Sequence, residues 1–267
     1  MLVPSLINPP RILDLDEQVS LTGAIAQMGR RALLLDWGKA DERSDLSVSG
    51  HVEELLLPLL RSIDEPVALI GYCLGGTMAI AAANLIEVER VATLAAPWKF
   101  THYPESSHRS LQDMWQHSRA AALAFGALPM EVLQAAFWSL DPERTVRKFA
   151  KFGRLDLDCA EARRFIELEE WANEGEPLPY PAAKELVEDL FGKDLPQSGG
   201  WIVAGRPASD IISAPSLHLT AQKDLIAPPQ TAASGNVIAI QSGHVGMIVG
   251  SARQKLHDEL RRFLCPR

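Results

Sequence analysis

The feature that most constrains the fold of this chain is a glycine-rich turn between an apolar strand and a helix of small residues. Residues 67–70 read Val-Ala-Leu-Ile, residues 71–75 read Gly-Tyr-Cys-Leu-Gly, and a run of small and apolar residues follows from 77 to 85. A strand that turns this sharply into a helix needs close backbone approach, which glycine permits because it has no Cβ. The pattern is typical of a turn that presents a nucleophile, and here the nucleophile position holds Cys73.

The composition favours one folded α/β unit and excludes several classes of protein. The chain has 267 residues, of which 47% are hydrophobic, so it can bury a full core. Its net charge of −8 argues against nucleic-acid binding. No apolar run approaches the roughly 20 residues of a membrane span, and the first residues lack the basic start of a signal peptide. Three widely spaced cysteines predict no disulfide framework and a reducing, cytoplasmic location.

Apolar strand patterns alternate with helical patterns in both end regions of the chain. Strands are expected at 2–7, 32–36, 67–70, 91–95, 216–220 and 237–240, and helices at 15–28, 52–62, 77–86 and 247–264. This alternation predicts a mostly parallel sheet with helices on both faces. In that context the turn at Cys73 is typical of the α/β-hydrolase fold.

The middle of the chain breaks that alternation. It is expected to form five helices, at 111–125, 130–138, 142–152, 160–173 and 182–191. We interpret 100–200 as a helical cap inserted between the fourth and fifth strands, with 1–99 and 201–267 as the two parts of the core.

Two further residues complete a candidate catalytic triad. Asp224 follows the predicted strand 216–220, and His244 follows the strand 237–240. Because ligands bind at the carboxyl ends of parallel strands, Cys73, Asp224 and His244 are expected to meet at one edge of the sheet. There His244 would take the proton of Cys73, and Asp224 would hold the imidazole in the required tautomer.

The remaining site residues are expected around this triad. The backbone N–H of Leu74 is predicted to form half of an oxyanion hole. The loop after the first strand would supply the other half from Asn8 or Arg11, with Asn8 preferred, because the prolines between them have no N–H. Residues expected to contact the substrate are Tyr72, Trp98 and Arg147. No metal site is expected, because the histidines and cysteines lack ligand spacing.

Some patterns in the cap have two interpretations. One helical face carries cations that would suit the phosphates of coenzyme A, although most such faces are simply solvated: Arg144, Arg147, Lys148 and Lys151. A set of aromatic residues would line an acyl pocket or pack between helices: Trp115, Trp138, Trp171, Phe137 and Phe165. Asp36, at a strand end, is expected to cap a turn.

The chain resembles the poly(3-hydroxyalkanoate) synthases, which are cysteine-dependent polymerases with an α/β-hydrolase fold. The matching motifs occur in order at 2–15, 34–38 (Leu-Leu-Asp-Trp-Gly), 71–77, 93–97 (Thr-Leu-Ala-Ala-Pro), 171–175 (Trp-Ala-Asn-Glu-Gly), 224–228 and 243–246. The resemblance assigns the nucleophile to Cys73, the acid to Asp224 and the base to His244. It implies transfer of an acyl group from an (R)-3-hydroxyacyl-CoA thioester to Cys73 and then to a growing polyester. Coenzyme A enters as part of the substrate, so no cofactor is expected.

The resemblance also implies a homodimer and contact with the surface of a polyester granule. Members of the family carry a region before the first matched strand, so this sequence is expected to be a short, divergent member. Alternatives remain open: an esterase, thioesterase, polyester depolymerase or dienelactone-type hydrolase would use the same triad. A non-catalytic accessory protein is a third class.

Overall fold

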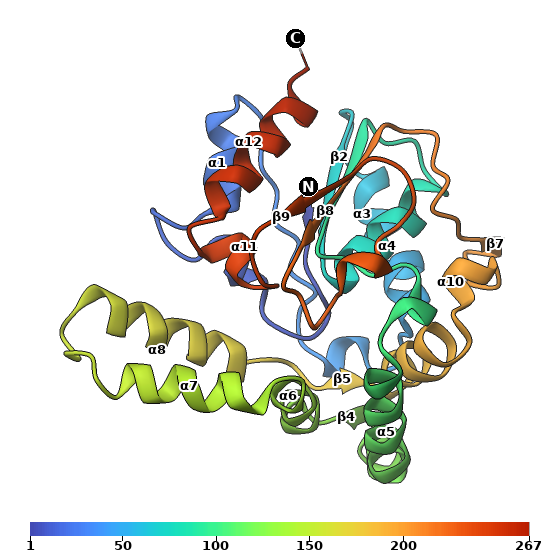
Figure 1. Ribbon diagram of the computed structural model, residues 1–267. Coiled ribbons are helices and arrows are strands. Elements are labelled where there is room, and N and C mark those ends of the chain that lie inside the picture. The colour runs from blue at the N-terminus through green and yellow to red at the C-terminus, as the bar shows by residue number, and fades with distance from the viewer. Residues whose placement is uncertain (267) are drawn as a thin grey trace.

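A five-stranded parallel sheet forms the centre of the molecule in the computed structural model, which describes residues 1–266 (Figure 1). The strand order is β1-β2-β3-β8-β9, and every neighbouring pair is parallel. The strands are β1 (Leu2–Val3), β2 (Ala68–Tyr72), β3 (Arg90–Leu94), β8 (Ser216–Ala221) and β9 (Val237–Ile240).

Helices cover both faces of this sheet because its strands are apolar on both sides. Val3, Leu69 and Val91 pack into one core, whereas their neighbours Leu2 and Ile70 pack into another. The first core is covered by α2 (Val48–Gly50), the π-helical turn η3 (His51–Leu56), α3 (Leu57–Arg61) and α4 (Leu74–Ala83). The second is covered by α1 (Leu21–Gln27), α11 (Gly246–Val249) and α12 (Arg253–Leu264). Buried strands with helices on both faces confirm the predicted fold class.

A long helical insertion separates β3 from β8. It contains α5 (Glu105–Phe125), α6 (Met130–Ser139), α7 (Pro142–Phe152), α8 (Ala160–Asn173), α9 (Tyr180–Lys184), the π-helical η5 (Glu185–Phe191) and α10 (Leu195–Ser198). Short two-stranded pairs join β4 (Ala127–Leu128) to β5 (Leu178–Pro179) and β6 (Ile202–Val203) to β7 (Arg206–Pro207). The α7–α8 hairpin extends away from the sheet (Figure 1). The division of the chain at 100 and 200 stays a prediction.

Short 3₁₀ turns complete the chain at η1 (Pro10–Leu13), η2 (Asp41–Arg43), η4 (Phe100–His102) and η6 (Pro229–Thr231). No helix among residues 1–266 has both the length and the apolar character needed to cross a membrane.

Two expected strands are shorter than predicted. The first strand ends at Val3, because Pro4 has no N–H to continue the ladder. Its partner at 32–36 is therefore reduced to a single bridge between Leu2 and Leu34. The insertion consequently follows the third strand of the sheet and not the fourth, which corrects the prediction.

Two expected helices also differ from the structure. The helix predicted from residue 15 begins only at Leu21, because the Asp16 carboxylate accepts hydrogen bonds from Gln18 and Val19 in a turn and Ser20 then caps α1. The final helix is interrupted between α11 and α12 at Gly250, where a Cβ would lie 2.6 Å from the Gly246 carbonyl oxygen.

Candidate active site

Cys73 occupies a strained turn between β2 and α4. Its backbone has a φ of 54° and a ψ of −130°. Such values are rare for a residue with a Cβ. The turn is tight because its glycines lie against neighbouring atoms: a Cβ on Gly75 would lie 2.2 Å from the Val3 carbonyl oxygen, and one on Gly76 would lie 2.3 Å from the Ala96 Cβ. These contacts hold the Cys73 side chain at the carboxyl end of the sheet, the position in which this type of turn presents a nucleophile.

Asp224 and His244 form a buried pair on the loops after β8 and β9. Their side chains are joined by a 2.6 Å contact between His244 Nδ1 and Asp224 Oδ2. The other carboxylate oxygen of Asp224 accepts hydrogen bonds from the backbone N–H groups of Ile226 (2.8 Å) and Ala227 (2.9 Å). Because the carboxylate is held by its own loop, it can orient the imidazole of His244.

The charges around His244 favour its protonated form. Burial alone would lower the pKa of His244, but the negative charges of Asp224 and Cys73 and hydrogen bonds to both outweigh it and raise that pKa from 6.5 to about 10. Cys73, His244 and Asp224 therefore form one electrostatic unit, in which the imidazole is a strong acceptor for a proton.

A narrow cavity of about 160 Å³ gives access to Cys73 and His244. Its wall includes Tyr72, whose ring lies 5.0 Å from that of His244, centroid to centroid. The Tyr72 hydroxyl is buried and has no hydrogen-bond partner among residues 1–266. Burial, followed by the charges of Cys73 and Asp224, raises the pKa of Tyr72 well above its usual range. The hydroxyl therefore stays neutral and can donate a hydrogen bond to a ligand in the cavity.

The two residues predicted for the oxyanion hole lie next to this cavity. Leu74 is the first residue of α4, so its N–H has no acceptor within the helix. It also lies at the N-terminus of α4, where the helix dipole places a partial positive charge. Asn8 lines the cavity and fixes its side chain by donating to the Ala172 carbonyl oxygen at 3.3 Å. This placement is compatible with the predicted role of both residues.

Two predicted substrate contacts are corrected by the structure. Trp98 is fully buried in the core, where its ring lies 6.0 Å from that of Trp201, and it does not line the cavity. Arg147 points to solvent on α7 and pairs with Glu143 at 3.2 Å. Arg144 and Lys148, one turn apart on α7, face the triad, whereas Arg147 lies beside them at the solvent edge of the same helix.

Arg144 and Lys148 line a second cavity of about 190 Å³, which Asp224 and His244 also line. Lys148 is paired with Glu169 at 2.6 Å. Arg144 forms no ion pair within residues 1–266, and its guanidinium lies against Gly243, the neighbour of His244. An unpaired cation therefore stands at the edge of the triad.

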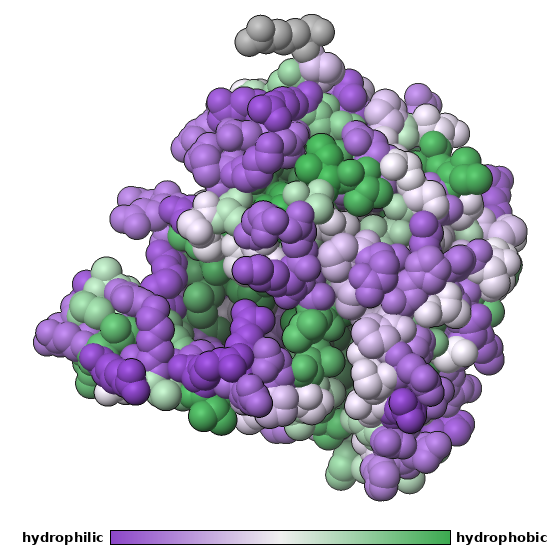
Figure 2. Space-filling model, viewed as in Figure 1, coloured by the Kyte–Doolittle hydropathy of each residue, from purple (hydrophilic) through white to green (hydrophobic). Residues whose placement is uncertain are grey.

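The predicted aromatic set is divided by the structure. Phe137, Trp138 and Trp171 line the cavity at Cys73. Trp115 instead packs on Tyr180, and Phe165 stacks on Phe152 between α7 and α8. The three lining residues come from α6 and α8, and Figure 2 shows a hollow with apolar residues at its bottom between the α7–α8 hairpin and the rest of the molecule.

The lining residues that were not predicted from the sequence include Gln134 and Ile226. Gln134 lies in the cavity wall and donates to the Ala172 carbonyl oxygen at 3.2 Å; its isolation in the apolar stretch of α6 was the available signal. Ile226 lines the cavity two positions after Asp224. Asp36 caps a turn by accepting from the Gly38 N–H at 3.0 Å, as expected. No group of three potential ligands for a metal ion lies within residues 1–266.

A parallel sheet, a nucleophile turn and an acid–histidine pair on later strand ends define an α/β-hydrolase fold. Solved structures agree with this class. An extracellular α/β-hydrolase from a Paenibacillus species matches with a TM-score of 0.58 and 13% identity over 97% of this chain and 96% of that one. The monoacylglycerol lipase of Paleococcus ferrophilus matches with a TM-score of 0.56 and 16% identity, over 98% of this chain and 92% of the lipase.

Within this class the chain is similar to poly(3-hydroxyalkanoate) polymerases, which confirms the resemblance predicted from its motifs. It is 25% identical over 270 residues to the polymerase subunit PhaC of Haloferax mediterranei, across 94% of this chain and 55% of that protein. It is also 25% identical to the PhaC subunit of Synechocystis sp., across 100% of this chain and 77% of that protein. No protein-family model matches the chain.

The chain spans about half the length of the first of these relatives. By their names the compared proteins are enzymes, either transferases or hydrolases.

Proposed function

We propose that this protein is an acyltransferase that uses Cys73 as its nucleophile and acts on 3-hydroxyacyl-CoA thioesters. The observation that carries the proposal is the buried His244–Asp224 pair beside a cysteine held at a strained strand end. A cysteine suits this chemistry because its thiolate attacks a thioester readily and forms a thioester of equal energy, so the acyl group stays activated for the next transfer. Similarity to proteins named poly(3-hydroxyalkanoate) polymerases supports this substrate class.

In the first half-reaction the Cys73 sulfur, whose proton His244 has already taken, attacks the thioester carbonyl carbon. The negative charge that develops on the carbonyl oxygen is stabilised by the N–H of Leu74 and by a second donor, for which Asn8 is proposed. The carbon–sulfur bond to coenzyme A then breaks. His244 returns the proton to the leaving thiolate, and the acyl group remains on Cys73.

In the second half-reaction an acceptor oxygen attacks the acyl-Cys73 thioester and gives its proton to His244. The hydroxyl end of a polyester chain as acceptor would make the protein a polymerase. Water as acceptor would make it a hydrolase with the same residues. The mostly apolar cavity wall supports the first outcome, because an aromatic and aliphatic lining disfavours the approach of water to the acyl-enzyme.

Arg144 is proposed to bind the phosphates of coenzyme A. It lines the cavity next to His244 and carries a charge that no carboxylate within residues 1–266 neutralises. A guanidinium matches the geometry of phosphate oxygens and can make two parallel hydrogen bonds to them. This role replaces the one predicted for Arg147, which lies three residues further along α7 and pairs with Glu143 in solvent.

The central test is release of coenzyme A from 3-hydroxybutyryl-CoA, followed with a thiol reagent, with the size of the acyl product determined in the same reaction. Cys73→Ala is expected to abolish release, whereas Cys265→Ala, which removes an exposed cysteine, is expected to leave it intact. Polyester would identify a polymerase and free hydroxy acid a hydrolase. Release by Cys73→Ala at the wild-type rate would refute the proposed nucleophile.

The role of Arg144 is tested with Arg144→Gln and the matched variant Arg147→Gln. Loss of one charge-assisted hydrogen bond costs about 1.5–3 kcal/mol, so Arg144→Gln is expected to raise the KM for the CoA thioester roughly ten- to hundredfold. The KM for p-nitrophenyl butyrate, which has no phosphate, is expected to change little in either variant. An equal effect on both substrates would contradict phosphate binding.

The resemblance also extends to a cytoplasmic homodimer at a polyester granule. These remain proposals; sedimentation of the purified protein and its partition onto isolated granules test them.

A further inference from the structure

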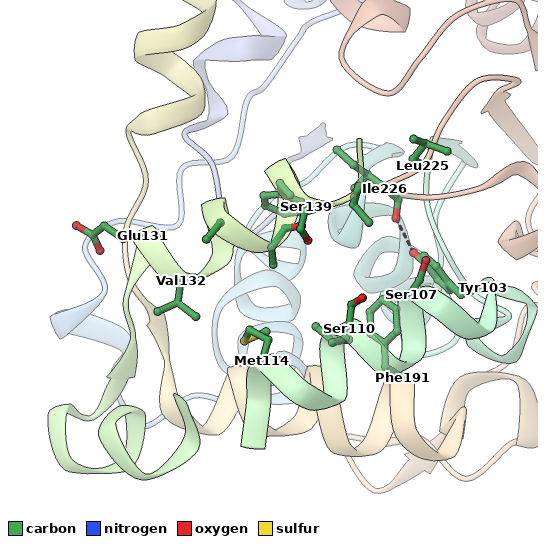
Figure 3. Close-up of a pocket in the computed structure, with 15 residues that line it drawn as sticks. Tyr103, Ser107, Ser110, Met114, Glu131, Val132, Ser139, Phe191, Leu225 and Ile226 are labelled. Atoms are coloured by element: carbon green, nitrogen blue, oxygen red, sulfur yellow. Dashed lines mark hydrogen bonds between the residues drawn. The ribbon is translucent and has the colours of Figure 1, made fainter. Parts of the chain in front are cut away.

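A large apolar cavity lies beside the candidate active site and takes no part in the reaction described above. It measures about 530 Å³ and lies between α5, α6 and η5. Figure 3 shows Ser107, Ser110 and Met114 along α5, with Val132 and Ser139 on α6 across from them. Its wall is mostly carbon, so it suits an apolar ligand and offers little to a nucleotide or a sugar.

The large cavity and the cavity at Cys73 share two wall residues. Phe137 of α6 and Ile226 of the loop after Asp224 line both. The two spaces are therefore neighbours that share Phe137 and Ile226 as a common wall. Both residues are half-buried, and a change of rotamer at their side chains would join the two spaces without a change of fold.

The size of the cavity at Cys73 limits what it can hold. A methylene group occupies about as much space as a water molecule, which takes roughly 30 Å³. The volume of about 160 Å³ at Cys73 is therefore filled by the reacting carbonyl and the first carbons of an acyl group. A longer chain must continue elsewhere, and ten carbons need roughly 300 Å³. The neighbouring cavity, at about 530 Å³, is large enough to hold them.

We propose that the cavity between α5 and α6 binds the alkyl chain of the acyl group, which passes between Phe137 and Ile226 from Cys73. The proposal rests on the proposed function and adds the substrate class, namely acyl groups with a medium-length alkyl chain. Each methylene that enters the cavity leaves water, which favours longer acyl groups by up to about fourfold per methylene.

The loop that carries Ile226 is fixed at both sides. The backbone N–H of Ile226 donates to the Asp224 carboxylate. The backbone carbonyl oxygen of Ile226 accepts a hydrogen bond of 2.9 Å from the Tyr103 hydroxyl (Figure 3). Tyr103 itself lines the large cavity. Burial, followed by the charges of Cys73 and Asp224, raises the pKa of Tyr103. The Tyr103 hydroxyl therefore keeps its proton, and its hydrogen bond fixes the position of Ile226 relative to the triad.

The test fills the large cavity with a bulky side chain at a position that does not line the cavity at Cys73. Ala136 on α6 is such a position, and Ala136→Phe adds a ring where the chain would lie. Ala150→Phe, on the exposed face of α7, is the matched control. Initial rates are measured with 3-hydroxyacyl-CoA substrates of four, six, eight and ten carbons. The readout is the ratio of kcat/KM for the ten-carbon to that for the four-carbon substrate.

The wild-type ratio is expected to exceed about 50, and Ala136→Phe is expected to lower it at least tenfold. Ala150→Phe is expected to keep the wild-type ratio. Turnover that depends on Cys73 but not on chain length would overturn the proposal and leave the proposed function standing. An Ala136→Phe variant that keeps the wild-type ratio would likewise overturn the proposal and leave the proposed function standing.

A second measurement keeps the proposal testable if no substrate is turned over, a result that would refute the proposed function. Sodium decanoate is expected to raise the thermal midpoint of the wild-type protein and of Ala150→Phe, but not that of Ala136→Phe. Sodium butyrate is expected to have no effect. Equal stabilisation of Ala136→Phe and wild type by decanoate, or none of either, would overturn the alkyl site.

Discussion

Replacement of Asp224 by asparagine is the most informative single change in this protein. The carboxylate uses Oδ1 to accept from the N–H groups of Ile226 and Ala227, and Oδ2 to accept from His244 Nδ1. In Asp224→Asn the amide oxygen must keep the two backbone donors, so the amide NH₂ faces His244. That NH₂ can only donate, which forces Nδ1 to accept and places the imidazole proton on Nε2. His244 then cannot take the proton of Cys73.

The expected loss is large. In a serine-protease triad the same change reduces turnover roughly 10⁴-fold through the wrong tautomer. Here the charge matters as well. Burial lowers the pKa of His244, and Asp224 is the first of the groups that raise it to about 10 against burial. The variant would lose the largest of the interactions that favour the imidazolium. We expect the pKa of His244 to fall, and coenzyme A release to drop roughly 10³- to 10⁴-fold.

The assay compares release of coenzyme A with alkylation of Cys73 by iodoacetamide between pH 5 and 10. The two backbone hydrogen bonds to residue 224 survive the substitution, so the variant should stay folded, but with a lower thermal midpoint because the charge that stabilises the imidazolium is lost. Asp64→Asn removes an exposed carboxylate and serves as the control. An Asp224→Asn variant that is folded and retains more than a tenth of the wild-type rate would refute the reasoning.

Three further predictions concern stability. Gly75→Ala should lower the free energy of unfolding by at least about 3 kcal/mol, because its Cβ would overlap the Val3 carbonyl oxygen, whereas Gly153→Ala should not; equal urea midpoints would contradict this. Tyr72→Phe should raise that free energy by about 1 kcal/mol, because it removes a buried hydroxyl without a partner among residues 1–266; a lower urea midpoint would show that the hydroxyl is satisfied. Because the pKa of His244 is raised from 6.5 to about 10, its contribution to stability is complete below pH 6.5 and is lost as the pH rises toward 10; His244→Gln should flatten the pH dependence of the urea midpoint across that range.

The fold class, the nucleophile turn and the candidate triad could be predicted from the sequence alone. Strands such as β2 are short apolar runs, and the turn at Cys73 depends on glycines whose neighbours in space leave no room for a side chain. Both signals are local, so they can be read from a few consecutive residues. Asp224 and His244 were found because each follows a strand of a parallel sheet, which makes their proximity a consequence of topology.

Where local signals compete, the sequence was a weaker guide. The 32–36 segment has the composition of a strand, but its ladder depends on β1, which Pro4 cuts to two residues. Residues 15–20 fit a helical pattern, but the Asp16 turn and the Ser20 cap satisfy the backbone first and delay α1.

Only the tertiary structure decided which cap residues face the triad. Arg144 and Arg147 lie on one helix and have the same chemistry, yet only the rotation of α7 against the loops after β8 and β9 places Arg144 at the cavity. Trp98 and Trp138 likewise look equivalent in sequence, and packing buries one in the core and puts the other in the cavity wall. The large apolar cavity between α5, α6 and η5 has no sequence signature, because it is the space that remains where these three helices do not pack against one another. Helix rotation and the gaps between helices depend on contacts between residues far apart in the chain, so no window of the sequence contains them.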